Sequence, residues 1–237
     1  TPNYEFLKQL QTNTAVFSMF KTHASMKEMA ALIKDKDGNV RTREQFKAEA
    51  LKVDKTFRHT HLEVQYDTGV RTARMASMWP KIQQNKHLYP NLKYLMSKAS
   101  KPDKQHLSFV GIIRPVDDIF WQKHFPPNRW RCQCGVEQTD DAVTDLPGDL
   151  PAISDEFAFN AGAIGQVFDI KNSEYIKSVP PKDQPALIKK AKALFQADQA
   201  AELPYHTLYK SKNGGSVTIH PATFIEKDLD NLVKNAR

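Results

Sequence analysis

Cysteine is scarce in this chain: its 237 residues include only two, Cys132 and Cys134, which stand one residue apart. A disulfide between such near neighbours would be strained by its tight geometry. A secreted disulfide scaffold is therefore disfavoured. A reduced, intracellular setting with metal or thiol chemistry is expected instead.

Long apolar runs and common enzyme signatures are also lacking. No apolar run approaches the roughly 20 residues that a membrane helix needs, so we expect no membrane partner. No GxxxxGK loop, GxSxG elbow or HExxH motif occurs, which leaves most standard enzyme classes without support. The N-terminus has no signal-peptide pattern and begins with Thr1 rather than Met, which indicates a fragment or a processed chain.

What the chain does contain is typical of a soluble globular protein of one large or two small domains, with 40% hydrophobic and 26% charged residues. Its net charge of +7 is unevenly spread. Residues 68–102 hold seven basic and no acidic side chains, and residues 132–170 hold eight acidic and no basic ones. The basic block could meet DNA phosphates or an acidic protein surface, or the two blocks could face each other within the fold. The candidate contact residues are Arg71, Arg74, Lys81, Lys86 and Lys93.

The first third of the chain reads as helix. Apolar residues at helical spacing predict helices over residues 4–10 and 16–33, followed by a turn at residues 35–39. Thr42 and Gln45 form a capping box that opens a long helix. We expect that helix to reach Trp79, where Pro80 limits it, with a break near Gly69.

The remainder predicts an α+β fold. Short strands and loops are expected between residues 89 and 136, around an irregular core held by Cys and His residues. A helix starts near Asp183, a β-hairpin pairs residues 206–210 with 216–220 across an Asn-Gly-Gly turn, and a last helix covers residues 224–236. The predicted domains are 1–138 (helical lead-in 1–80, core 89–138), an acidic connector at 139–156, and a C-terminal α+β appendage at 157–237.

Two histidines and the two cysteines are candidate metal ligands. His106, His124, Cys132 and Cys134 could close a tetrahedral zinc site. Alternatively, the cysteines are small buried residues in a tight turn, and His106 bonds a backbone carbonyl. A thiol nucleophile is disfavoured, because no protease signature surrounds either cysteine.

The tail offers a second, weaker site. His206 and His220, with neighbouring lysines, could act as the general base and acid of a metal-independent ribonuclease. The favoured alternative is a small α+β tail with exposed histidines, because most of the sheet that such a nuclease needs is missing.

A series of motifs runs in order through residues 62–137. It consists of Glu63-Val64-Gln65-Tyr66, Thr72-Ala73, Trp79, Tyr89-Pro90-Asn91-Leu92-Lys93-Tyr94, His106, Gly111, Arg114-Pro115-Val116-Asp117-Asp118, Trp121 and Pro126-Pro127-Asn128-Arg129-Trp130-Arg131-Cys132-Gln133-Cys134. This order resembles the phage Mu F-like family of minor head proteins, also called phage head morphogenesis proteins. The chain departs from the family pattern at Asp103-Lys104-Gln105, where an arginine is usual before the histidine, and at Gln133, where arginine is usual. Both departures weaken an anion-binding role.

The resemblance implies a non-enzymatic virion protein that acts in procapsid assembly. Its implied partners are the phage portal and capsid proteins, with packaged DNA as a further one, and its implied location is the virion and, during assembly, the cytoplasm of the bacterial host. Some members of the family carry C-terminal toxin domains. The alternative function is therefore a phage-delivered effector with a ribonuclease-like C-terminal domain.

Overall fold

The computed structural model describes residues 3–200, 206–210 and 216–219. Its first element is one long helix, α1 (Tyr4–Ala31), which spans both of the helical segments predicted near the N-terminus. The Asn3 side chain caps it by accepting a hydrogen bond from the Phe6 N–H at 3.0 Å. Its buried residues recur at intervals of about one turn, so one stripe of the helix faces the core. They are Leu10, Asn13, Val16, Phe17, Phe20 and Ala24.

The predicted turn after α1 is confirmed. The Asp35 carboxylate accepts hydrogen bonds from the N–H groups of Asp37 and Asn39, both at 2.9 Å. Lys34 and Val40 form an isolated antiparallel bridge across it. The turn therefore closes a hairpin between α1 and the next helix, and α1 and α2 are in contact.

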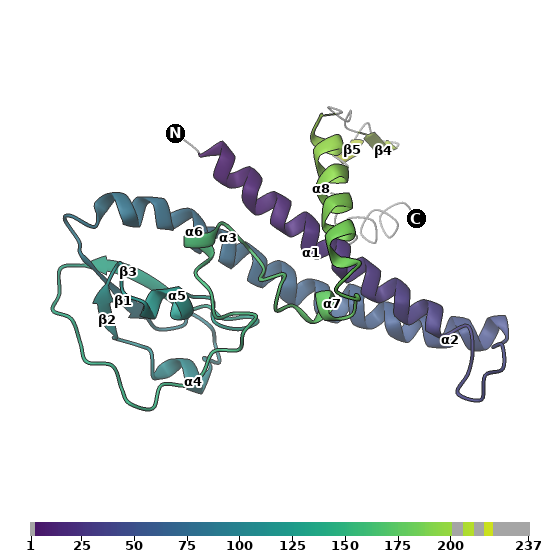
Figure 1. The fold of residues 1–237 in the computed structure, drawn as a ribbon, viewed down its shortest axis with the longest axis horizontal. Coiled ribbons are helices and arrows are strands. Elements are labelled where there is room, and N and C mark those ends of the chain that lie inside the picture. Colours follow the sequence, from purple (N-terminus) through teal and green to yellow (C-terminus); the bar gives the residue numbers. More distant parts are fainter. Residues whose placement is uncertain (1–2, 201–205, 211–215, 220–237) are drawn as a thin grey trace. The chain divides into compact units, whose positions relative to one another are not determined.

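The capping box is also confirmed at the start of α2 (Arg43–Asp54). The Gln45 N–H donates to Thr42 Oγ1 at 3.3 Å, and the Thr42 N–H donates to Gln45 Oε1 at 2.9 Å. The helix then passes through a π-helical segment, η1 (Lys55–His61), into α3 (Leu62–Asn85). Together they form the long rod of Figure 1.

Two details predicted for this rod are wrong. It does not break at Gly69, which lies inside α3. Glycine suits this position because the Phe168 ring packs closely on it: a Cβ there would lie 2.9 Å from Phe168 Cζ. Nor does it end at Pro80, because α3 continues to Asn85. A proline inside a helix costs about 3 kcal/mol. Trp79 and Ile82, on either side of it, are buried in the core and hold the helix in register.

A three-stranded antiparallel sheet lies beside the end of α3, with strand order β2-β1-β3. The strands are β1 (Asn91–Leu95), β2 (Ile113–Pro115) and β3 (Gly135–Thr139). Leu92 pairs with Arg114 on one side and with Gln138 on the other. The run before Ile113, also expected to be strand, instead forms the short helix α4 (Lys104–Leu107) and turns.

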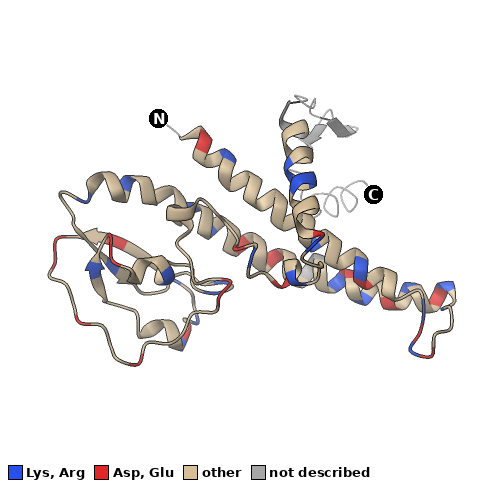
Figure 2. Ribbon diagram, viewed as in Figure 1, with Lys and Arg blue, Asp and Glu red and all other residues tan. Residues whose placement is uncertain are grey.

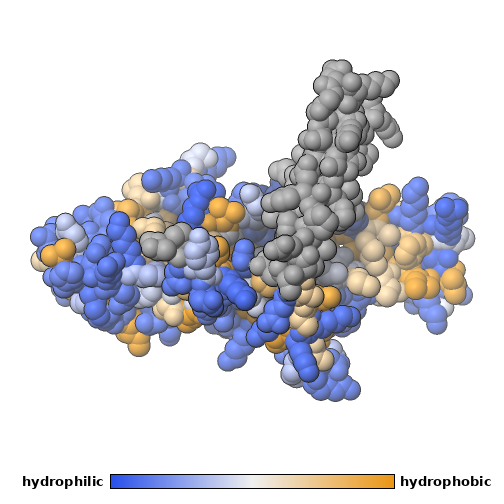
Figure 3. Space-filling model, turned by 90° about the horizontal axis from the view of Figure 1, so that it is seen from above, coloured by the Kyte–Doolittle hydropathy of each residue, from blue (hydrophilic) through white to orange (hydrophobic). Residues whose placement is uncertain are grey.

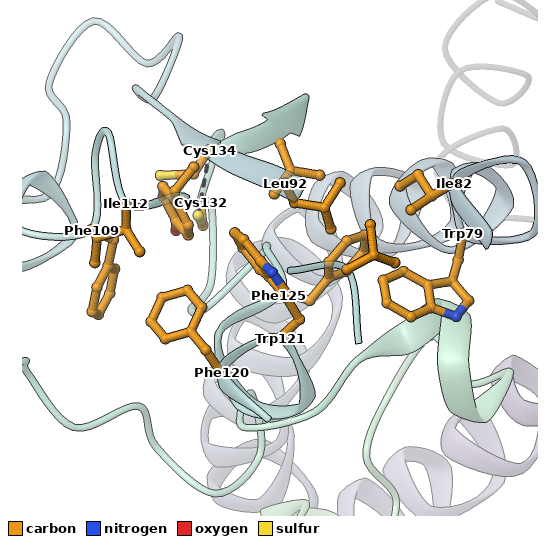
Figure 4. Packing of buried hydrophobic residues seen from close by; sticks show 13 residues of the cluster. Trp79, Ile82, Leu92, Phe109, Ile112, Phe120, Trp121, Phe125, Cys132 and Cys134 are labelled. Carbon is orange, nitrogen blue, oxygen red and sulfur yellow. Dashed lines mark hydrogen bonds between the residues drawn. The ribbon is translucent and has the colours of Figure 1, made fainter. Parts of the chain in front are cut away.

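The main hydrophobic core is built between this sheet, α3 and the short helix α5 (Phe120–His124), as Figure 4 shows. Trp121, Tyr94 and Phe109 are fully buried. Trp79 of α3 meets Phe125 edge to face, with ring centroids 5.2 Å apart. Both cysteines belong to this cluster, so the expected core around the Cys and His residues is confirmed.

The acidic segment after β3 is held against the sheet. The Thr144 N–H donates to the Ile113 carbonyl at 3.1 Å, and the Ile113 N–H donates to Thr144 Oγ1 at 3.0 Å. Asn91 Nδ2 donates to the Asp141 carbonyl at 2.8 Å. Further along lie two single-turn helices, α6 (Ala161–Ile164), which packs on α3, and α7 (Glu174–Lys177), which packs on α1.

Contacts divide the chain into two compact units, Thr1–Pro181 and Lys182–Arg237. The second contains α8 (Gln184–Ala200) and a hairpin of β4 (His206–Lys210) and β5 (Ser216–Ile219), so the helix and the hairpin predicted there are confirmed. The helix predicted over residues 224–236 lies outside the described residues, and the domain boundaries predicted from the sequence stay predictions. The α+β class with a helical N-terminal half is confirmed. Among the described residues, no helix combines the length and apolar character needed to cross a membrane.

Candidate metal centre

Three of the four predicted ligands come together in the buried core. His106 Nδ1 lies 3.5 Å from Cys132 Sγ and 3.8 Å from Cys134 Sγ. The three ligand atoms all lie within 4.8 Å of one another, and the three residues are 5%, 6% and 8% exposed. The imidazole comes from α4 and the thiols come from the loop that leads into β3. The His106 ring nitrogen thus faces sulfur, and not a backbone carbonyl as the alternative from the sequence supposed.

The thiol loop owes its shape to Arg131. This residue adopts φ 63°, in the left-handed region, which is uncommon for a residue with a side chain. Its N–H donates to Thr68 Oγ1 on α3 at 3.0 Å. The left-handed residue redirects the chain immediately before Cys132, and its hydrogen bond anchors the loop to the long helix. Such a conformation costs on the order of 1 kcal/mol, so the surrounding contacts must hold it.

An ion pair ties α4 to the same loop. The Asp103 side chain caps α4 by accepting from the Gln105 N–H at 2.8 Å, and its other carboxylate oxygen pairs with Arg129. Asp103 is thus attached both to the helix of His106 and to the loop of the cysteines. Sequence reasoning missed this pair. The sequence feature that points to it is Asp103, an acidic residue at the N-cap position of a helix that begins with Lys104.

Interaction between the two thiols moves their pKa values apart. Hydrogen bonding from Cys134 lowers the pKa of Cys132 to about 4, and His106 and the backbone N–H groups of Asn128 and Cys134 act in the same direction. The same interaction, with burial, raises the pKa of Cys134. The neighbouring donors therefore favour the thiolate form of Cys132. A divalent cation would stabilise the second thiolate, since metal ligation requires deprotonated thiols.

A buried hydrogen bond between two side chains lies next to the candidate centre. The Tyr94 hydroxyl donates to Asn128 Oδ1 at 2.8 Å, and both side chains are at most 2% exposed. Burial raises the pKa of the Tyr94 hydroxyl, which keeps it protonated and able to donate. Because the Asn128 backbone N–H also approaches Cys132, this bond orients the turn around the sulfur.

The donor set fits zinc. Zn–S bonds of about 2.3 Å and Zn–N bonds of about 2.0–2.1 Å at a tetrahedral angle place sulfur and nitrogen about 3.6 Å apart. The observed Sγ to Nδ1 distances of 3.5 and 3.8 Å bracket that value. Two thiolates and one neutral imidazole are also a ligand combination that zinc uses. A metal could therefore enter with little rearrangement.

His124 lies outside this group, contrary to the four-ligand prediction. Its Nδ1 is 3.1 Å from the Phe120 carbonyl one turn earlier in α5, and its ring stacks on the Phe120 ring at 4.4 Å. Phe109 packs against both His106 and His124, with centroid distances of 5.7 and 5.3 Å. Burial lowers the pKa of His124. His124 is thus a core histidine of α5 and leaves the centre one ligand short of four.

The predicted basic contact residues are not equally free to meet a partner. Lys86 pairs with Asp117 at 2.8 Å, and Lys93 pairs with Asp141 at 3.6 Å. The second pair joins the basic block to the acidic block within the fold, as the alternative from the sequence supposed.

The other three basic candidates lie on α3. Arg74 and Lys81 are exposed, whereas Arg71 is half-buried and its Nη1 has no hydrogen-bond partner among the described residues. Figure 2 shows acidic and basic residues interspersed along α2 and the end of α1, without a surface of one sign there. Contact with DNA stays a prediction.

The weak nuclease site cannot be assembled from the described residues. His206 is the first residue of β4. His220 lies outside the described residues. The structure therefore brings no pair of catalytic histidines together in the part of the tail that it describes.

Residues 23–137 match the family model described as Phage Mu protein F like protein, and this range includes all three residues of the centre. The chain is 34% identical over 71 residues to "Putative capsid assembly protein F" of Escherichia phage Mu, covering 30% of this chain and 16% of that protein. It is 31% identical over 81 residues to "Mu-like prophage FluMu F protein" of Haemophilus influenzae, covering 34% and 20%. No solved structure matches. The aligned parts thus span a fifth or less of these relatives.

Proposed function

We propose that this chain, which is similar over residues 23–137 to the Mu F-like family, is a phage minor head protein that acts in capsid assembly. The observation that carries this proposal is the family match over residues 23–137, which spans the helical rod and the whole Cys/His core. The name of the Escherichia phage Mu relative supports the assembly role. The location that we propose for the protein is the virion and, during assembly, the cytoplasm of the bacterial host.

The partner surface that we propose is the helical hairpin formed by the end of α1, the turn and α2, residues 22–54. Helix α2 has no buried residue along its 12 residues. Helices this short are marginal in water without tertiary packing. Four large apolar side chains are exposed on this hairpin. Figure 3 shows hydrophobic residues, in orange and tan, at its right end, where the hairpin lies. The four exposed side chains are Met26, Ile33, Val40 and Leu51.

We assign this surface to a protein of the phage head, namely the portal or a capsid protein, rather than to DNA. DNA binding depends on a surface of positive charge. The hairpin carries both signs, and two of the five predicted basic residues are already paired within the fold. An apolar surface with mixed charges fits a protein partner better.

Within this protein, we propose that His106, Cys132 and Cys134 hold a zinc ion. The ion would neutralise the charge of the second thiolate and stabilise the core that carries the family motifs. Purified protein should contain about one equivalent of zinc, and Cys132→Ser should lose it. A folded protein that is free of zinc and takes up none when it is supplied would contradict this assignment.

The assembly role is tested by co-sedimentation. The full chain is mixed with portal rings of its phage, and bound protein is measured after centrifugation. The expected result is binding that falls at least tenfold in Leu51→Asp. The matched control is Ile119→Asp, which places the same charge on a 78% exposed residue of the sheet region. Equal binding of both variants would refute the hairpin surface, and absence of the chain from portal rings, capsids and mature virions would refute the assembly role.

The alternative of a nuclease effector is not favoured by the comparisons, whose names refer to capsid assembly and to phage Mu F. RNA incubated with the chain provides a direct check. Cleavage that disappears on changing His206 would restore the effector function.

A further inference from the structure

An open cavity of about 330 Å³ lies against the candidate metal centre. His106, a ligand, forms part of its wall, and so does Asn128, whose backbone N–H contacts the Cys132 sulfur. The remaining wall includes Phe109, Trp130, Ile153 and Glu156. The cavity therefore ends at groups that touch the ligand atoms.

The centre has three protein ligands within the described part of the chain. No further His, Cys, Asp or Glu among the described residues joins the group formed by His106, Cys132 and Cys134. Structural zinc sites almost always use four protein ligands, whereas sites with three keep an exchangeable fourth position. The centre thus has a coordination position that no described residue fills, and His106 is the ligand that it shares with the cavity wall.

We propose that the zinc held by His106, Cys132 and Cys134 keeps an open fourth position facing this cavity, where water is exchanged for a small anion from solvent. This inference rests on the zinc site proposed above. The volume allows it, because a water molecule occupies about 30 Å³ of liquid and the cavity is roughly ten times larger.

The charges of the site fit such a ligand. A divalent zinc ion with two thiolates and one neutral imidazole is formally neutral, so it accepts either water or one anion. Glu156 faces the same cavity, accepts a hydrogen bond from Trp130 Nε1 at 3.2 Å, and has a pKa raised by burial. Its carboxyl therefore repels an anion less than an exposed carboxylate would. Arginine is missing beside His106 and between the cysteines, and the one arginine in the cavity wall, Arg129, is already paired with Asp103. The metal is therefore the cation that is left to hold the anion.

The test uses the full chain loaded with cobalt(II), which reports its coordination in the visible spectrum. One equivalent of cobalt with a thiolate-to-cobalt absorption band shows that the site is occupied. Sodium azide is then titrated as the probe. The expected result is a saturable change in the cobalt spectrum. Ala152→Trp, which fills the cavity, should abolish the change while cobalt uptake is retained. Ala142→Trp, the same change at an exposed position of the same segment, should leave it intact.

The possible failures are distinguishable. A cobalt protein that shows the thiolate band and does not respond to azide has a closed site, which would overturn the open position and leave the zinc proposal standing. An azide response that is unchanged in Ala152→Trp would overturn the route through the cavity. Failure to bind either zinc or cobalt would overturn both the metal site and its open position.

Discussion

Gly162 provides a strict test of how α6 packs on α3. A Cβ at this position would lie 2.1 Å from Trp79 Cβ, 2.7 Å from Trp79 Cγ and 3.1 Å from the Ala76 carbonyl oxygen. Non-bonded carbon atoms normally stay about 3.5 Å or more apart, so Gly162→Ala requires the two helices to separate by about 1.4 Å. The obstacle is an atom fixed to the backbone of α3, and it cannot rotate away.

The magnitude follows from two opposing effects. Overpacking of this kind costs about 1–3 kcal/mol, and the upper part of that range applies because backbone must move. Alanine in place of glycine recovers about 0.4–1 kcal/mol by restricting the unfolded chain. We therefore expect Gly162→Ala to lower the free energy of unfolding by about 2 kcal/mol.

Urea denaturation followed by circular dichroism measures this change. With an m value of about 2 kcal/mol/M, a loss of 2 kcal/mol lowers the urea midpoint by about 1 M. The matched control is Gly148→Ala, because a Cβ at Gly148 meets nothing within 4 Å. It should be neutral or slightly stabilising. A Gly162→Ala midpoint equal to or above that of Gly148→Ala would refute the close packing of α6 on Trp79.

Three further predictions concern buried and half-buried polar groups. Asn13→Ala should lower the free energy of unfolding by about 2–4 kcal/mol in urea, because the Asn13 side chain accepts from two backbone N–H groups after α6, both at 2.9 Å. Glu156→Gln should stabilise the protein more at pH 7 than at pH 4, because a carboxyl pKa raised by burial means that stability is lost as pH rises through it. His124 should titrate below 6.5 by NMR. Because its folded pKa is lowered, its contribution to stability is present above pH 6.5 and is lost on acidification, and a titration above 6.5 would contradict its burial in α5.

The sequence predicted local features of the fold well where one short motif decides them. The capping box of Thr42 and Gln45 and the turn at residues 35–39 depend on neighbouring residues, and both form as expected. The end of the rod was missed because it depends on distant contacts. Pro80 would terminate an isolated helix, yet the burial of Trp79 and Ile82 in the sheet core carries α3 past it. Gly69 resembled a break because Phe168, almost a hundred residues away, is invisible in local sequence.

The candidate centre shows the same limit. Residue type pointed to His106, Cys132 and Cys134, because thiolate and imidazole are the usual ligands of zinc and few cysteines and histidines occur in this part of the chain. His124 matched in type and spacing, but stacking on Phe120 within its own helix determines where its ring lies. The supports of the centre were missed altogether. The pairing of Asp103 with Arg129 and of Tyr94 with Asn128 involves residue types that occur everywhere on a protein, and only the fold brings them together.

The position of the thiol loop gives the centre a role beyond the sheet. Arg131, next to Cys132, donates a backbone hydrogen bond to Thr68 in the first half of α3. Trp130, one residue earlier, donates to Glu156 and meets Phe157 edge to face at 5.0 Å. The loop that supplies both sulfur ligands is thus also the loop that joins the sheet core to the long helix and to the segment after β3. A metal bound there, as proposed above, would restrain the sheet core relative to the rod whose far end carries the proposed partner surface. Fixing that geometry is a physical reason for placing a buried Cys/His centre in a protein whose proposed work is assembly and not catalysis.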